Sequence, residues 1–293
     1  MVAVSVVMSA YNPGPLLERS LGSVLAQTHT DLEVVVVDDA SSEDITSCPG
    51  MDDPRVRHIR LPVNRGVGEV LNTGVWEARS EYVAFLAHDD DWMPEKLERQ
   101  VPALVERPEA PFCYTDFEWV FANGEVKPDR QGQVTYKGLL AHQTVSFCSL
   151  LLRRDAYFKI GGLSSSLVWA QDYDFLLRTL DGRPLPVHVP EVLTRYYLHS
   201  ANHSSNYRGS VGYRKMVLRM HRTKALRNGR DDVVAACEAG LERAQELYAF
   251  QAFDRARVAY REGRSVRMLS ELGEVARTRP SVLIGAAKQK LRP

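Results

Sequence analysis

The sequence predicts an α/β fold, in which helices flank a mostly parallel sheet and a helical extension follows at the C-terminus. Three observations lead to this prediction. Short runs of β-branched residues alternate with amphipathic helical segments over the first 110 residues. Polar clusters follow three of these runs, where strands of a parallel sheet are expected to end. Beyond about residue 205, apolar residues recur at helical spacing only.

The elements of the first half are expected in strict alternation. The predicted strands cover residues 2–8, 32–37, 56–61 and 82–86. The predicted helices cover residues 16–27, 68–78 and 94–105, the last with Pro94 in its first position. Because strands covered on both faces read as continuous apolar runs, we expect a parallel sheet with helices on both sides.

The pattern loosens after residue 110. We expect strands over 112–121, 146–153 and 187–197, and a helix over 169–180, all built on the same sheet. Near the C-terminus Gly263 separates two helical segments, which together indicate a helical hairpin. We therefore predict two domains, 1–205 and 206–293, and we divide the first into halves at 1–110 and 111–205.

Composition limits the partners and the compartment. The 37 basic and 37 acidic residues balance, so nothing attracts the whole chain to nucleic acid or to an anionic membrane. The four cysteines lie far apart, which indicates neither a zinc site nor a disulfide framework and fits a reducing compartment. No stretch reaches the roughly 20 apolar residues of a membrane span. We expect a cytoplasmic protein, with any membrane contact peripheral and at the inner face.

Three adjacent carboxylates, Asp89 to Asp91, follow the predicted strand 82–86. They repel one another, and a divalent cation is a common reason for gathering them. Mg²⁺ and Mn²⁺ prefer oxygen ligands and often bind one or two carboxylates together with substrate phosphates. The alternative is a solvated acidic loop in which Asp91 caps the helix expected from Pro94. The triplet alone does not separate these interpretations.

Two more polar clusters follow neighbouring strands. Asp38 and Asp39 end the second strand and either accept hydrogen bonds from a base or a ribose, or form a turn. Arg65 lies in the segment Asn-Arg-Gly-Val-Gly, where its guanidinium fits a phosphate and the glycines allow close backbone approach. The alternative there is a glycine turn with a surface arginine.

The second half holds a candidate base and a candidate metal ligand. Asp172 and Asp174 begin an apolar helix, and one of them can serve as a general base unless both only cap the helix. His199 follows the last extended stretch and is either a third metal ligand or a surface histidine.

Taken in order, these segments resemble the family 2 glycosyltransferases over roughly residues 3–205. Val-Ser-Val-Val-Met-Ser-Ala-Tyr-Asn resembles that family's first strand and nucleotide loop. Val-Val-Val-Asp-Asp-Ala-Ser and Asn-Arg-Gly-Val-Gly-Glu-Val-Leu-Asn-Thr-Gly resemble its next blocks, and Phe-Leu-Ala-His-Asp-Asp-Asp-Trp-Met-Pro resembles its metal motif. Gly-Gly-Leu followed by Gln-Asp-Tyr-Asp resembles the catalytic-base segment, and Tyr-Tyr-Leu-His the closing histidine segment.

The resemblance implies the GT-A fold, with a Rossmann-like sheet, and a nucleotide-sugar site in its first half. On this basis Ala10, Tyr11 and Asp39, with Asp38 nearby, hold the base and the ribose. Arg65 contacts the base or the diphosphate of the donor. The second half is then the part that faces the acceptor.

The resemblance also implies the metal ligands and the base. Asp89 and Asp90 stand at the DXD motif, where they bind Mn²⁺ or Mg²⁺ and the donor diphosphate, and His199 completes the metal site. Asp172 deprotonates the acceptor hydroxyl. The family pattern is broken at three positions: Ala87 and Gln171 replace acidic residues, and Tyr197 stands where arginine is frequent.

The implied activity is metal-dependent transfer of a sugar with inversion at its anomeric carbon. The donor is a UDP-, dTDP- or GDP-sugar and the acceptor is the hydroxyl of a saccharide or a lipid-linked saccharide. Cell-surface polysaccharide (cell-wall) or glycolipid synthesis is the expected setting. The alternative is a catalytically idle nucleotide-sugar-binding or interaction protein of the same fold, for which Ala87 and Gln171 are the best support.

Residues 208–230 contain eight basic residues and no acidic one. A basic helix of this kind is typical of contact with anionic lipid or a lipid phosphate. The alternative, which we favour slightly from sequence alone, is a solvated helix face neutralised by acids of the next helix.

Overall fold

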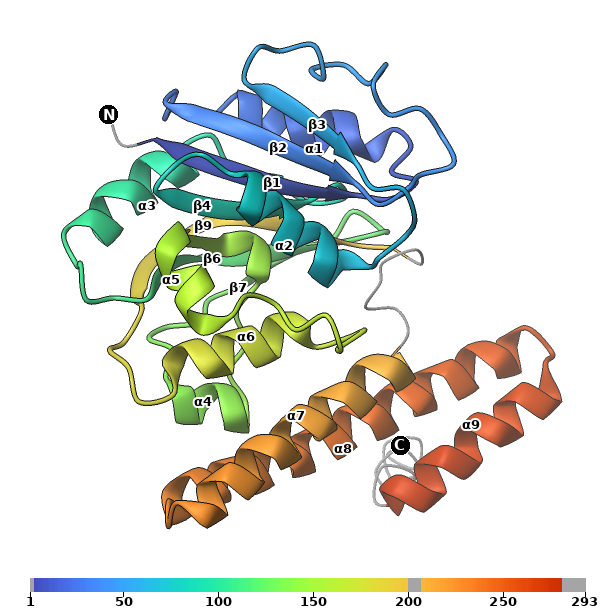
Figure 1. The fold of residues 1–293 in the computed structure, drawn as a ribbon. Coiled ribbons are helices and arrows are strands. Elements are labelled where there is room, and N and C mark those ends of the chain that lie inside the picture. The colour runs from blue at the N-terminus through green and yellow to red at the C-terminus, as the bar shows by residue number, and fades with distance from the viewer. Residues whose placement is uncertain (1–2, 200–206, 281–293) are drawn as a thin grey trace. The chain divides into compact units, whose positions relative to one another are not determined.

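The computed structural model describes residues 3–199 and 207–280 (Figure 1). The chain divides into two compact units. The first holds residues 1–139 and 143–202, and the second holds residues 140–142 and 203–293. The first unit is built on one sheet, and the second is helical in its described part.

The strands follow the sequence pattern closely in the first half of the chain. The sheet is built from β1 (Val4–Ala10), β2 (Leu32–Asp38), β3 (Val56–Arg60), β4 (Tyr82–Ala87), β5 (Asp91–Trp92), β6 (Phe112–Phe121), β7 (Val126–Asp129), β8 (Leu150–Arg153) and β9 (Val187–Leu198).

The strand order is β3-β2-β1-β4-β8-β6-β9-β5, and β7 pairs with β6 at the side. The first four strands are parallel, whereas β8 is antiparallel to both of its neighbours. In the parallel part Ala10 pairs with Asp38, and Ser9 pairs with Ala87. The loops that follow β1, β2 and β4 therefore leave the sheet at the same edge, which is where ligands bind in open α/β sheets.

The helices are α1 (Leu16–Leu25), α2 (Val67–Glu77), α3 (Lys96–Val105), α4 (Tyr136–Ala141), α5 (Arg154–Ile160), α6 (Gln171–Leu180), α7 (Tyr207–Arg227), α8 (Asp231–Arg261) and α9 (Ser265–Thr278), with a short 3₁₀ turn at Phe147–Ser149.

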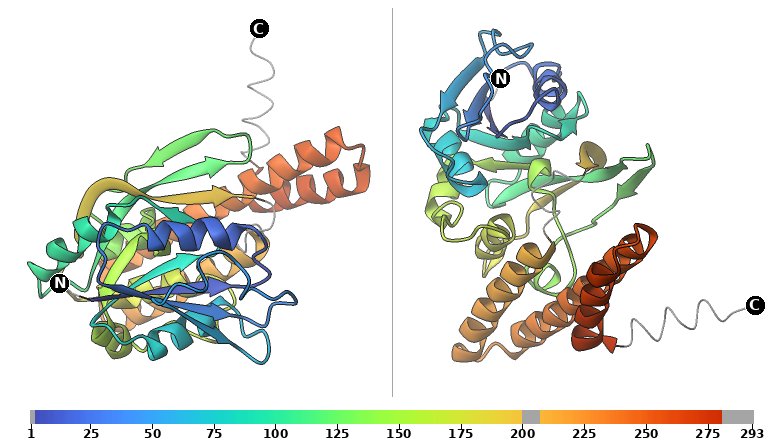
Figure 2. Two further views of the ribbon diagram at one scale, coloured as in Figure 1. Left: turned by 90° about the horizontal axis from the view of Figure 1, so that it is seen from above. Right: turned by 90° about the vertical axis from the view of Figure 1, so that its right-hand side faces the viewer.

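The parallel strands are covered on both faces, as their continuous apolar runs predict. Val6 and Met8 of β1 share a buried cluster with Leu21 of α1, while Val37 of β2 packs with Val70 of α2 in a second cluster. The right-hand view of Figure 2 shows α1 and α2 on opposite sides of the sheet. Burying such runs from both sides removes nearly all their apolar surface from water, at about 25 cal/mol per Å².

Two details of the predicted elements are wrong. The third helix begins at Lys96, not at Pro94, because Pro94 lies in the turn that precedes it. Asp91 does not cap that helix. It lies in β5 and pairs with Arg195 of β9, a strand that follows about a hundred residues later and whose partner the local sequence does not indicate. The strand β7 and the helices α4 and α5 were not predicted.

The second unit contains the predicted helical hairpin and one more long helix. Gly263, at a φ of +70°, forms the turn between α8 and α9, and the backbone N–H of Arg264 bonds the carbonyl of Ala259 at 2.8 Å. Tyr207, Ala252 and Val275 form its buried cluster with Ala249. No helix in residues 3–199 and 207–280 is long and apolar enough to cross a bilayer.

Candidate functional site

The loop after β4 brings together two of the predicted metal ligands. The Nε2 atom of His199 lies 3.1 Å from Oδ2 of Asp89, although the two residues are 110 positions apart. Asp89 follows β4, and His199 follows β9. Both side chains are partly exposed, 13% for Asp89 and 29% for His199. A carboxylate and an imidazole that meet at a surface form part of a ligand set that suits Mn²⁺.

Asp90 faces the protein interior instead. Its residue is 1% exposed. Oδ1 accepts a hydrogen bond from the Tyr197 backbone N–H at 3.1 Å, and Oδ2 accepts one from the Cys148 thiol at 3.2 Å. Burial, reinforced by the neighbouring charge of Asp89, raises the pKa of Asp90 to about 8. Asp90 therefore anchors the loop from inside.

The three predicted metal ligands, Asp89, Asp90 and His199, do not form one cluster. Across the residues that the structure describes, no group of three or more His, Cys, Asp or Glu side chains is placed to hold a metal ion. Asp89 and His199 are brought together, and Asp90 points away from them into the core. A metal at this pair therefore needs further ligands, and donor phosphates commonly supply them.

Asp91 belongs to a charged network beneath the loop. Its Oδ2 accepts a hydrogen bond from the Tyr197 hydroxyl at 2.8 Å and lies 3.5 Å from Nε of Arg19. Arg195 lies 3.7 Å from its other oxygen and also binds Glu118 at 3.0 Å. Because Asp91 is buried and paired, it fixes β5 against β9 and leaves Asp89 as the outward-facing member of the triplet.

Helix α1 holds this loop through polar side chains that the sequence analysis did not single out. Arg19 donates to the Asp89 carbonyl at 2.5 Å, and Ser20 donates to the His88 carbonyl at 2.7 Å. Further along, the Ser23 hydroxyl accepts from the Trp92 N–H at 3.2 Å and Gln27 donates to the Met93 carbonyl at 2.8 Å. Arg19, Ser20 and Ser23 lie on adjoining faces of α1, and Gln27 lies two residues beyond its end. This spacing of polar residues was the available signal.

The loops after β1 and β2 are joined to each other. Ala10, the last residue of β1, accepts a hydrogen bond from the Asp39 N–H at 2.8 Å, and Tyr11 beside it is 48% exposed. Asp38 is fully buried. One of its oxygens accepts from the Ser41 N–H at 2.8 Å and the other from the Arg60 guanidinium at 2.9 Å, so both are engaged inside the protein.

Asp39 ties these loops to the segment that carries Arg65. Its two oxygens accept the backbone N–H groups of Arg65 at 2.6 Å and Gly66 at 2.8 Å. Gly66 has a φ of +82°, which favours glycine, and it precedes α2 directly. The Arg65 side chain is exposed and makes no ion pair within the described part of the chain. The predicted nucleotide residues thus share one loop cluster.

Of the two candidate bases, only Asp172 is exposed. Asp174 is 5% exposed, and its carboxylate pairs with Arg178 one turn later at 2.8 Å. Asp172 lies in the first turn of α6, where Oδ1 accepts the N–H of Tyr173 at 2.7 Å. The preceding Ala170 has a φ of +62°, an uncommon conformation for a non-glycine residue. Asp172 therefore lies at the surface, whereas Asp174 stabilises its own helix through the pair with Arg178.

Helix α2 is fastened to α5 and to the turn at Leu163 through a residue that the sequence analysis missed. Asn72 of α2 donates to the Leu163 carbonyl at 3.0 Å and accepts the Leu163 N–H at 3.0 Å and the Tyr157 hydroxyl at 2.6 Å. A Cβ on Gly68 would lie 3.7 Å from Cγ of Gln171. Helices α2 and α6 therefore meet at Gly68 and Gln171. The bonds between Asn72 and Leu163 give the Asn-Thr-Gly and Gly-Gly-Leu blocks a structural role.

Comparison with known families gives one clear match. The model described as "Glycosyl transferase family 2" matches residues 5–157, which is more than half of the chain. An uncharacterised glycosyltransferase of Haemophilus influenzae is 28% identical over 78% of this chain and 80% of its own length. The UDP-Glc:α-D-GlcNAc-diphosphoundecaprenol β-1,3-glucosyltransferase WfgD of Escherichia coli is 28% identical over 69% and 80%. The chain spans only 34% of two Rickettsia relatives.

Solved structures share the fold at low sequence identity. Residues 1–349 of Staphylococcus aureus TarS, in complex with UDP-GlcNAc, superpose with a TM-score of 0.62 at 17% identity and cover 92% of this chain and 90% of theirs. The mannosyltransferase PcManGT from Pyrobaculum calidifontis, in complex with GDP-Man and Mn²⁺, gives 0.60 at 20% identity and covers 93% and 85%. The GT-A fold expected from the resemblance is confirmed.

Proposed function

Because this chain belongs to glycosyl transferase family 2, we propose that it moves a sugar from a nucleoside-diphosphate sugar to an acceptor hydroxyl with inversion at the anomeric carbon. The observation that carries the proposal is the meeting of Asp89 and His199 at 3.1 Å, at the sheet edge where the loops after β1, β2 and β4 emerge. An outward carboxylate–imidazole pair beside a loop cluster suits a divalent cation, which would in turn bind the diphosphate.

The donor site, in this proposal, is the loop cluster held by Asp39. Tyr11 is exposed there, and Arg65 is exposed and makes no ion pair with residues 3–199 and 207–280, so both are available to a ligand. Tyr11 offers an aromatic face for the base, and Arg65 a fork of donors for the diphosphate. Ala10 lies behind them, while Asp38 and Asp39 hold the loops that present them. The UDP-GlcNAc and GDP-Man complexes of the two neighbours support a nucleotide-sugar donor in general and leave its base open.

The cofactor we propose is Mn²⁺ or Mg²⁺, held by Asp89 and His199. The donor chemistry fits, since one carboxylate and one imidazole leave several positions for phosphate oxygens. PcManGT, a neighbour in fold, is described with Mn²⁺. A metal bound here would offset the charge of the diphosphate. Asp90 supports this pair from the core, through Tyr197 and Cys148.

The base in this proposal is Asp172. As the acceptor oxygen forms its bond to the anomeric carbon, the bond from that carbon to the diphosphate breaks and the acceptor proton passes to a carboxylate oxygen of Asp172. The nucleoside diphosphate leaves with the electron pair. Asp172 is exposed and can meet an acceptor hydroxyl, whereas Asp174 is buried and paired with Arg178, so Asp172 is preferred. A positioned base contributes about 10²–10⁴-fold in rate.

For the acceptor we propose the hydroxyl of a saccharide, free or lipid-linked, in cell-surface polysaccharide or glycolipid synthesis. The name of WfgD, which describes a diphosphoundecaprenol-linked acceptor, supports this class. A cytoplasmic location with peripheral membrane contact completes the proposal, and four free cysteines are compatible with a reducing compartment.

The alternative, a catalytically idle nucleotide-sugar-binding protein, rested on Ala87 and Gln171, and one of these two arguments is weakened. Gln171, one of its two arguments, is 6% exposed and packs beside Gly68. Because Gln171 is buried between helices, a glutamine in place of the family's acidic residue does not remove an exposed carboxylate. Ala87, at the end of β4, is the argument that remains.

Release of nucleoside diphosphate tests the proposed function. The full chain is incubated with UDP-glucose, UDP-GlcNAc, dTDP-glucose or GDP-mannose and Mn²⁺, with and without a polyprenyl-diphosphate saccharide as acceptor. We expect one donor to be turned over, faster with acceptor, and EDTA to stop it. Binding of a donor without turnover of any, under these conditions, would favour the idle binding protein.

A further inference from the structure

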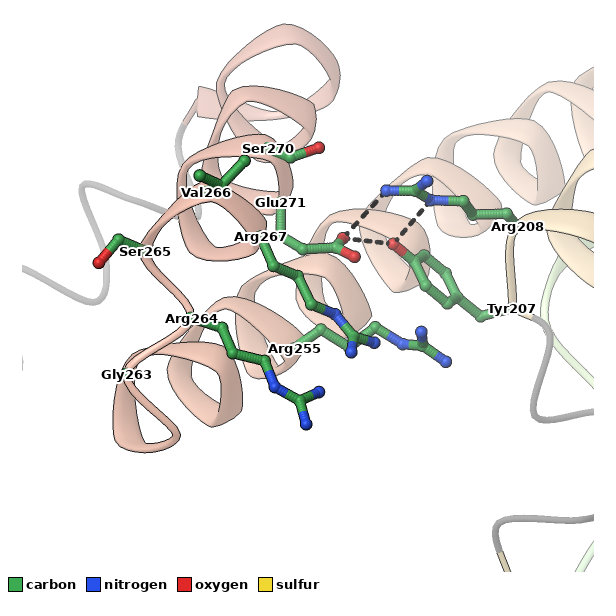
Figure 3. Close-up of a pocket in the computed structure, with 10 residues that line it drawn as sticks. All are labelled: Tyr207, Arg208, Arg255, Gly263, Arg264, Ser265, Val266, Arg267, Ser270 and Glu271. Atoms are coloured by element: carbon green, nitrogen blue, oxygen red, sulfur yellow. Dashed lines mark hydrogen bonds and ion pairs between the residues drawn. The ribbon is translucent and has the colours of Figure 1, made fainter.

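An open groove of about 1100 Å³ lies among the helices of the second unit (Figure 3). The start of α7, the late part of α8, the α8–α9 turn and the first turns of α9 line it. All of these segments belong to the second unit, so the groove is complete without the nucleotide-sugar site of the first. Its volume lies just above the roughly 300–1,000 Å³ of small-ligand pockets.

The lining is strongly basic. Four of the ten lining residues are arginines, Arg208, Arg255, Arg264 and Arg267, whereas Glu271 is the single acidic one. Figure 3 shows these four side chains, which come from α7, α8, the α8–α9 turn and α9. Like charges gathered in this way repel one another, and an anion between them relieves the repulsion.

The acidic residue is already engaged at the floor of the groove. Glu271 is 5% exposed, and its Oε2 accepts a hydrogen bond from the Tyr207 hydroxyl at 2.7 Å. The same oxygen lies 3.3 Å from Nη2 of Arg208. The negative charge of Glu271 therefore balances Arg208, and the other nine residues that line the groove include no acid.

Arg264 and Arg267 are two exposed arginines of the groove that can offer donors to a ligand. The Arg255 guanidinium lies over the Tyr207 ring, 4.6 Å from its centroid, and adds positive charge to the lining. Arg264 has one nitrogen 3.3 Å from Glu262, an exposed residue outside the groove. Arg267 makes no ion pair with any residue that the structure describes.

We propose that this groove binds the phosphate or diphosphate group of a second ligand, distinct from the sugar donor. Guanidinium groups present planar forks of N–H donors that match phosphate oxygens two at a time, and several of them together suit a group with more than one negative charge. Val266 lines the same groove and is 85% exposed, so an apolar surface lies beside the arginines. A phosphate attached to an apolar body fits this combination.

Inorganic pyrophosphate is the probe, because it carries the phosphate chemistry common to a lipid head group and a soluble phosphate ester. Its binding to the full chain is measured by calorimetry in EDTA, so that no metal recruits it to the donor site. We expect Arg264→Gln combined with Arg267→Gln to weaken binding about tenfold or more, because each change removes a charged fork. Arg261→Gln is the control, because it removes an exposed arginine from the last position of α8 without altering the lining.

A single change separates geometry from charge. Arg267→Lys keeps the positive charge and loses the planar fork, so we expect it to bind pyrophosphate more weakly than the wild type and more tightly than the double variant. Both altered positions are exposed, and far-UV circular dichroism with the unfolding temperature checks that each variant folds. Equal affinity of the wild type and the double variant would overturn the proposal, and so would an equal loss in Arg261→Gln.

Vesicle flotation distinguishes the two sources of the phosphate. Vesicles of phosphatidylcholine are compared with vesicles that also contain phosphatidic acid, whose head group is a phosphate monoester. Flotation that needs phosphatidic acid and is lost in the double variant assigns the groove to a membrane phosphate. Pyrophosphate binding without flotation assigns it to a soluble phosphate ester. Because neither assay involves sugar transfer, failure here leaves the proposed transferase activity untouched, and the reverse also holds.

Discussion

The guanidinium of Arg19 lies over the ring of Tyr197, 3.6 Å from its centroid, and donates a 2.5 Å hydrogen bond to the carbonyl of Asp89. One side chain of α1 thus joins the loop after β4 to the end of β9. The resemblance to the family's closing segment implies an arginine at position 197, and here the guanidinium of Arg19 lies over the tyrosine that stands there instead.

Arg19→Ala should weaken metal-supported donor binding about tenfold, the equivalent of about 1.4 kcal/mol, because the Asp89 loop loses a charge-assisted bond and its stack on Tyr197. The expected signature is a raised KM for donor and for Mn²⁺ with a smaller change in kcat, measured by nucleoside diphosphate release. Arg99→Ala, which removes an exposed arginine paired with Glu191, is the control. Unchanged KM values in Arg19→Ala would show that α1 does not position the loop.

Asp172→Asn should lower kcat by about 10²–10⁴-fold while donor binding is kept, because the amide cannot accept the acceptor proton. Single-turnover transfer and donor affinity are measured together. Asp155→Asn is the matched control, since Asp155 is also an exposed first-turn aspartate, paired with Lys159 on α5. Near wild-type turnover of Asp172→Asn would remove Asp172 from the role of base.

Gly74→Ala should destabilise the protein by about 1–3 kcal/mol or more, because its Cβ would lie 2.2 Å from Cγ1 of Val7 in the packed α2–β1 contact. Gly22→Ala in α1 meets nothing within 4 Å and should stabilise by about 0.5–1 kcal/mol through helix propensity. Urea unfolding of both variants checks the pair. Equal effects of the two changes would contradict the packing of α2 on the sheet.

Lys96 makes stability depend on pH. It is fully buried between Trp92, whose ring lies 3.9 Å from Nζ, and Gln100, whose Oε1 accepts a 2.7 Å hydrogen bond. Burial lowers the pKa of Lys96 from 10.5 to about 7. Between these values the unfolded chain binds more protons than the folded one, so this residue makes the free energy of unfolding increase with pH.

The comparison of the wild type with Lys96→Met isolates that contribution. The free energy of unfolding of the wild type minus that of the variant should rise from pH 7 toward pH 10, by at most about 1.4 kcal/mol per pH unit. Taking the difference cancels the opposite effects of groups such as Asp90, whose pKa is raised. A flat difference over this range would mean that Lys96 stays charged in the folded protein.

The sequence predicted the strands well because four of them are buried on both faces and read as uninterrupted apolar runs. The same reasoning predicted a candidate site at the edge where these strands end. Asp89, His199 and Asp172 were candidates from their positions, and the family resemblance implied their roles. The sequence could not show that Asp90 faces the interior, because three adjacent aspartates are equivalent in sequence. Only the fold places Tyr197 and Cys148 beside Asp90.

The residues that were missed act over long distances along the chain. Arg19 reaches a carbonyl 70 positions away, and Asn72 bonds a turn 91 positions away. Hydrogen bonds to backbone carbonyls leave no motif of their own, because any residue can supply the carbonyl. The two residues of β5 were missed because they form a strand only through their pairing with β9.

The most direct test of a metal-dependent nucleotide-sugar site is thermal unfolding with UDP, GDP and dTDP, each with Mn²⁺ or EDTA, in the wild type and in Asp89→Ala. A ligand at 100 times its Kd stabilises by about 2.7 kcal/mol, which is readily measured. We predict that one nucleotide raises the Tm of the wild type with Mn²⁺, and that EDTA or Asp89→Ala abolishes this metal-dependent rise. An equal rise in EDTA, or an unchanged one in Asp89→Ala, would contradict a metal held at Asp89.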